Sequence, residues 1–97
     1  MDTLNLYDIL ENIGKKLYQN DNTAWLELQE VLPQLNTFIS EAVQISEGMK
    51  RTVLSVFPQL LEAIENTDQL LTADTVYYEI CDIIAVYEKM SNNRQIT

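Results

Sequence analysis

The chain has 97 residues, a length typical of one domain. Fifteen acidic residues against six basic ones give a net charge of -9, which repels the phosphate groups of nucleic acids and of anionic membranes. Hydrophobic residues make up 46% of the chain, whereas glycine and proline occur only twice each, a composition typical of long helices. We therefore expect one all-α domain over residues 1–90 that binds neither nucleic acid nor membrane.

The N-terminal segment and the single cysteine both indicate a cytoplasmic protein. Asp2 stands where a signal peptide would carry basic residues, and no apolar run approaches the roughly 20 residues that a membrane-spanning helix needs. Cys81 has no second cysteine with which to form an internal disulfide, which fits a reducing compartment. The chain contains no histidine, so catalytic triads and the usual zinc sites are excluded, and we expect no cofactor.

Apolar residues recur at steps of three and four in four segments, which predicts four amphipathic helices. We expect these helices over residues 4–19, 24–46, 50–71 and 74–90, with a flexible tail over residues 91–97. Gly48 is suited to the left-handed conformation that ends a helix, so the turn between the second and third helices is placed there. The pattern predicts an antiparallel four-helix bundle.

A weak internal repeat links the second and third helices. A shift of 25 positions places residues 31–35 on residues 56–60, and both segments carry a proline, Pro33 and Pro58. A proline inside a helix removes one backbone hydrogen bond and usually kinks the helix or ends it. We therefore expect kinks in the second and third helices.

The fourth helix has apolar residues on two sides. Its main stripe is broad, and Tyr78, Cys81 and Ala85 form a narrower stripe on the opposite side. Either this helix is central in the packing, or its back is an interface with another protein. We take Tyr78, Cys81 and Ala85 as the candidate interface, with Tyr78 as its anchor, because tyrosine is enriched at protein interfaces.

Two acidic pairs form the one candidate site for metal chemistry. Glu62 and Glu65 are followed after a short connection by Glu79 and Asp82, and this spacing resembles the paired acidic motifs of the all-α NTP pyrophosphohydrolases. The resemblance implies that these four carboxylates hold magnesium against a triphosphate. Leu61 stands where those enzymes usually have a further glutamate. Carboxylates that point away from the apolar stripes are also the pattern of a solvated helix face, so that interpretation stays open.

Residues 63–74, continuing to Tyr78 and Glu79, resemble small uncharacterised helical-bundle proteins of Firmicutes, some of them encoded near motility functions. This resemblance carries no functional residue. Size, charge and fold together favour a non-enzymatic interaction module of chaperone or adaptor type, in which a homodimer binds the helix of an unknown protein partner. The alternative is a magnesium-dependent nucleotide pyrophosphohydrolase.

Overall fold

The computed structural model describes the backbone of residues 3–96 and the side chains of residues 5–91, and the described chain is all-α, as the sequence predicts. Its elements, in order, are α1 (Thr3–Tyr18), α2 (Thr23–Ala42), α3 (Glu47–Glu65), α4 (Gln69–Asp74), the π-helix η1 (Thr75–Ile80) and α5 (Cys81–Ile96). None of these helices is long and apolar enough to cross a membrane.

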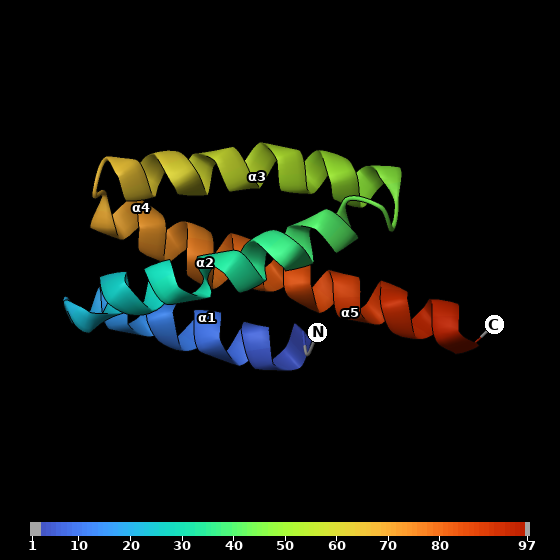
Figure 1. Ribbon diagram of the computed structural model, residues 1–97, viewed down its shortest axis with the longest axis horizontal. Helices are drawn as coiled ribbons and strands as arrows, with labels where there is room; N and C mark the ends of the chain where they lie inside the picture. The colour runs from blue at the N-terminus through green and yellow to red at the C-terminus, as the bar shows by residue number, and fades with distance from the viewer. Residues whose placement is uncertain (1–2, 97) are drawn as a thin grey trace.

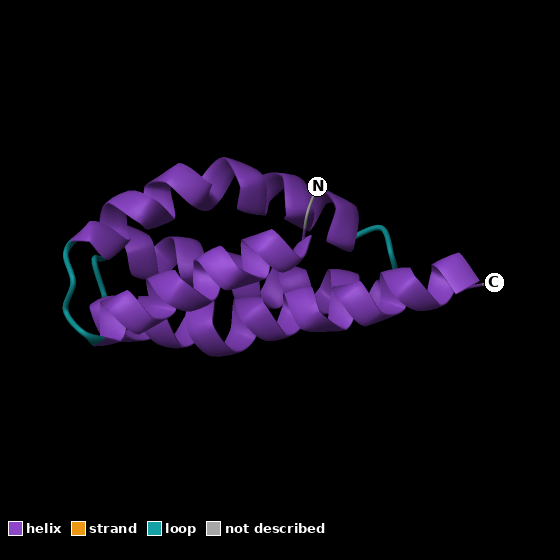
Figure 2. Cartoon of the chain, turned by 90° about the horizontal axis from the view of Figure 1, so that it is seen from below, coloured by secondary structure: helices purple, strands orange, loops and turns teal. Residues whose placement is uncertain are grey.

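The helices lie side by side in an elongated molecule of 44 × 23 × 20 Å (Figure 1). The elements α4, η1 and α5 follow one another without a break, and we call them together the long C-terminal helix (residues 69–96). Both α1 and α3 pack against this helix, and α2 packs against both α1 and α3. The turns before α2 and before α4 lie at one end of the molecule, and the turn before α3 lies toward the other (Figure 2).

The core is built from the apolar stripes that the sequence shows. Leu10, Leu35, Leu60 and Ile84, one from each of α1, α2, α3 and α5, are fully buried. Leu35 and Leu60 occupy matching positions in the internal repeat, whereas the two prolines of the repeat are exposed. Both α2 and α3 continue past their prolines, so neither helix is split there.

Two helices end in the same left-handed turn. Asn20 after α1 and Thr67 after α3 have φ values of 59° and 53°. In each case the next amide donates to the carbonyl five residues back: Asp21 N to Lys16 O and Asp68 N to Ala63 O, both at 2.9 Å. A β-branched threonine is rare in this conformation, so the sequence does not signal a turn at Thr67. As a result, the expected third helix, 50–71, extends past the observed end of α3 at Glu65. The chain turns at residues 66–68.

The other predicted boundaries also shift. Gly48 does not end a helix; it lies in the first turn of α3, without a positive φ, and Ser46 caps that helix by accepting a hydrogen bond from Met49 N at 3.0 Å. The fourth helix begins at Gln69 rather than Asp74, because Asp68 Oδ1 accepts a hydrogen bond from Leu71 N and caps it there. Of the expected tail, 91–97, residues 91–96 continue α5, and residue 97 lies outside the described residues.

Candidate interaction surface

A close approach between α1 and η1 determines where the tyrosines lie. Gly14, in the middle of α1, is buried, and a Cβ at this position would stand 2.9 Å from Tyr77 Cβ. A contact of that length is a steric clash, so only glycine lets the two backbones come this near. Tyr77 lies in the π-helix η1. Short π-helical segments inside α-helices are frequent at functional sites.

Three tyrosine rings form a chain across this contact. The Tyr18 ring meets the Tyr77 ring edge-on, with 5.9 Å between the centroids, and the Tyr77 ring meets the Tyr78 ring edge-on at 5.0 Å. These are the separations and angles that aromatic pairs prefer. Tyr77 is half-buried, but Tyr18 is 40% exposed and Tyr78 63% exposed. The chain of rings therefore runs from Tyr18 at the end of α1 to the strongly exposed Tyr78.

Asp74 and Leu70 complete this surface. The Tyr18 hydroxyl donates a hydrogen bond to Asp74 Oδ1, which joins the end of α1 to the end of α4. Leu70 is 65% exposed and lines a shallow hollow together with Tyr18. We call Tyr18, Leu70, Asp74, Tyr77 and Tyr78 the tyrosine patch.

Hydrogen bonds hold the two helices under the patch in place. Gln69 Nε2, in the first turn of α4, donates to Leu17 O at 2.7 Å and to Asn20 Oδ1 at 2.5 Å. Loss of water around the Tyr18 hydroxyl, together with its hydrogen bond to Asp74, raises the pKa of that phenol above its ordinary value. The phenol therefore stays protonated and remains a donor to the Asp74 carboxylate well above neutral pH.

The three candidate interface residues do not share one exposed face. Tyr78 is exposed, Ala85 is half-buried, and Cys81 is only 3% exposed. Burial, followed by the charge of Glu11 on α1, raises the pKa of the Cys81 thiol to about 12. Cys81 thus has the environment of a core residue. Since the long C-terminal helix packs between α1 and α3, part of its second stripe is covered within the molecule.

The four carboxylates of the candidate metal site lie exposed and do not gather. No group of three or more cysteine or acidic side chains suited to a metal ion is present among the described residues. Asp82 and Thr52 line the same hollow, which places Asp82 beside the first turns of α3. Glu62 lies ten residues further along α3, about 15 Å away at the rise of an α-helix. Glu62 and Asp82 therefore belong to different parts of the surface.

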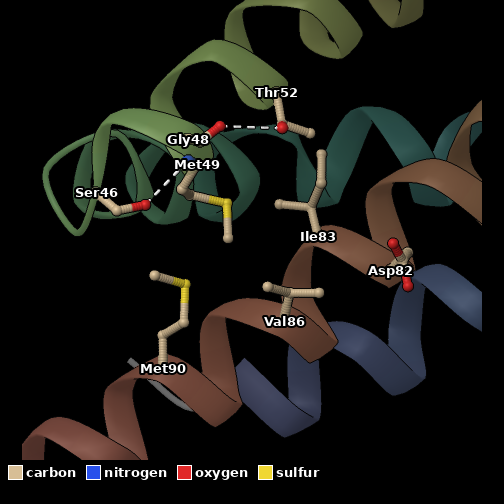
Figure 3. Close-up of a pocket in the computed structure, with 8 residues that line it drawn as sticks. All are labelled: Ser46, Gly48, Met49, Thr52, Asp82, Ile83, Val86 and Met90. Atoms are coloured by element: carbon tan, nitrogen blue, oxygen red, sulfur yellow. Dashed lines mark hydrogen bonds between the residues drawn. The ribbon is translucent and has the colours of Figure 1, made fainter.

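A second surface feature lies between the start of α3 and α5. Met49 and Met90 point toward one another across it, and Ile83 and Val86 form its α5 side (Figure 3). The hollow has a volume of about 380 Å³, and Asp82 stands at its edge. Methionine adapts its shape readily, so such a hollow can accept varied apolar groups.

The sequence singles out Tyr78 as an interface candidate but none of the other residues of the patch. Tyr18 and Asp74 are 56 positions apart, and no spacing rule connects them. The one local signal was Gly14, a residue that weakens a helix and is retained where another backbone comes close. Comparison with protein-family models, with curated proteins and with solved structures finds no match to this chain.

Proposed function

We propose that this chain is a non-enzymatic protein–protein interaction module that binds an amphipathic helix of a partner protein at the tyrosine patch. In this proposal it is a bacterial, cytoplasmic chaperone or adaptor. Its fold is an antiparallel four-helix bundle in which Pro33 and Pro58 bend the second and third helices, so that they curve around the core.

One observation carries the proposal: Tyr78, Tyr18 and Leu70 expose large apolar surfaces on elements that are otherwise firmly packed. Tyrosine offers a large contact area and loses little conformational entropy on binding, which is why it recurs among the residues that dominate binding energy. Helix recognition needs an apolar surface of this kind, and the partner helix would contribute residues at steps of three and four.

Selection of helical peptides from a displayed library tests this function. Enriched peptides should carry an apolar stripe, and Tyr78→Glu should weaken their binding at least about tenfold, because it places a charge at the centre of the contact. Leu26→Glu is the matched control, since Leu26 is 59% exposed on α2. Peptides that bind parent and Tyr78→Glu equally would overturn the proposal.

A second copy of the chain is the competing occupant of the patch, as expected for a homodimer. Light scattering on the parent and on Tyr78→Glu distinguishes the two. A dimer that becomes a folded monomer would assign the patch to self-association, whereas an unchanged mass leaves it to a partner. For the pyrophosphohydrolase alternative, the described residues offer no supporting observation, because no three of its four carboxylates form a group that could hold a metal ion.

A further inference from the structure

One long stretch of the chain carries charges of a single sign. Residues 52–88 include seven acidic residues and no lysine or arginine. The acidic residues are Glu62, Glu65, Asp68, Asp74, Glu79, Asp82 and Glu88. This stretch covers most of α3, all of α4 and η1, and the first half of α5, so the elements that carry Leu70, Asp74, Tyr77 and Tyr78 have a negative net charge.

The lysines of α1 do little to offset this charge. Lys15 pairs with Glu11 at 3.5 Å, and Lys16 Nζ donates to Glu27 Oε1 at 2.8 Å. The hydrogen bond to Glu27 raises the pKa of Lys16, so this ammonium stays charged. The nearby cations of α1 are therefore already matched by carboxylates of α1 and α2.

Asp74 stands beside the aromatic rings of the patch. Its Oδ1 accepts the hydrogen bond from Tyr18, whose ring begins the edge-on chain to Tyr77 and Tyr78. Asp74 is itself exposed, so its carboxylate can accept a further donor from outside the molecule. An arginine guanidinium suits this arrangement, because it stacks on an aromatic ring and donates to a carboxylate from the same planar group.

We propose that the partner helix is basic on its polar face, with an arginine that stacks on Tyr78 and donates to Asp74. This inference rests on the proposed function and adds the chemistry of the partner. A second copy fits the patch less well, because a two-fold interface places each patch against its own image and would bring the Asp74 carboxylates of both copies into one interface. Like charges opposed in this way cost binding energy.

Two designed peptides of about 20 residues test the inference, both with the same leucine stripe. One carries arginine on its polar face and the other glutamine at the same positions. Fluorescence anisotropy should show that the arginine peptide binds at least about tenfold tighter, and that its advantage shrinks between about 50 and about 300 mM salt because ions screen the attraction.

Variants of the patch locate the contact. Tyr78→Ala should weaken the arginine peptide about tenfold, and Asp74→Asn about fivefold, since Asn can still accept the hydrogen bond from Tyr18 but has lost the charge. Glu41→Gln removes one exposed charge from the last turn of α2 and should change binding less than twofold. Melting curves by circular dichroism verify that each variant is folded.

Each other outcome overturns the inference in a distinguishable way. If both peptides bind equally and Tyr78→Ala weakens both, the patch recognises an apolar helix and only its preference for a basic partner is wrong. If Asp74→Asn and Glu41→Gln act alike, the attraction comes from overall charge and not from Asp74. If neither peptide binds and Tyr78→Glu dissociates a dimer, the occupant is a second copy.

Discussion

The long C-terminal helix packs tightly against the molecule at one place and loosely at another. Where η1 meets α1, the backbone at Gly14 lies so near Tyr77 that even a Cβ would clash. Where α5 passes the first turns of α3, the two helices leave a hollow of about 380 Å³. We call the contact between Gly14 and Tyr77 the closed seam, and the hollow between Met49 and Met90 the open seam. We therefore expect that the position of η1, and with it that of the tyrosine patch, depends on the absence of a side chain at Gly14.

Gly14→Ala tests the closed seam most severely. Alanine favours helix formation by about 1 kcal/mol relative to glycine. Against this, the added Cβ would lie 2.9 Å from Tyr77 Cβ, so α1 and η1 must move apart. Overpacking of this kind costs about 1–3 kcal/mol, so we expect a net loss of stability of up to about 2 kcal/mol by urea unfolding, together with weaker peptide binding at the displaced patch.

Gly48→Ala is the matched control at the open seam. Nothing lies within 4 Å of a Cβ at Gly48, which is exposed in the first turn of α3. The same substitution should therefore stabilise the protein by about 0.5 kcal/mol through helix propensity alone. Equal effects at the two glycines would show that the seams do not differ and that Gly14 has no special role.

Thr72→Val tests whether a buried hydroxyl without a hydrogen-bond partner lowers the stability of the protein. Thr72 in α4 is fully buried, and its hydroxyl has no hydrogen-bond partner among the described residues. Removal of an unsatisfied buried hydroxyl at constant shape should raise the free energy of unfolding by about 1 kcal/mol.

Thr75→Val is the control for that change, since Thr75 is equally buried but its Oγ1 donates to Leu71 O at 2.8 Å. Loss of the Thr75 hydroxyl, and of its hydrogen bond, should leave the free energy of unfolding unchanged or lower it. A gain at Thr75 as large as that at Thr72 would attribute both effects to hydrophobicity and not to the missing partner.

Periodicity alone predicts most of this fold and little of the patch. The stripes correctly identify buried residues such as Leu10, Leu35 and Leu60, because burial on one face of a helix repeats at local steps. The break after α3 escapes the same reasoning, since it depends on Thr67 in a left-handed conformation that threonine rarely adopts. The apolar pattern simply continues across it.

The candidate site depends on contacts that have no local pattern. The π-helix η1 lies within a continuous helical sequence, so no local signal marks it. It lies where the C-terminal helix comes close to Gly14 on α1. Tyr78 could be named from sequence because it stands apart from the apolar stripe. The bond between Tyr18 and Asp74 could not, because it forms only when the ends of α1 and α4 meet.

High pH should lower the stability of the protein through Cys81, which lies one turn beyond Tyr77. Burial, and next the charge of Glu11 on α1, raises the pKa of this thiol. The thiol has a pKa of about 12 in the folded protein against an ordinary value of 9.0. Below about pH 9 the thiol is protonated in both states and stability does not depend on it. Above that pH only the unfolded chain releases the proton, so the free energy of unfolding falls as the pH rises toward 12, by about 1 kcal/mol at pH 10.

Cys81→Ala lacks this titration, and its stability, measured by urea unfolding at pH 8 and pH 10, should fall less than that of the parent. Parallel losses in the two proteins would mean that the Cys81 thiol is not held protonated by the fold, and that the closed seam admits water at this position.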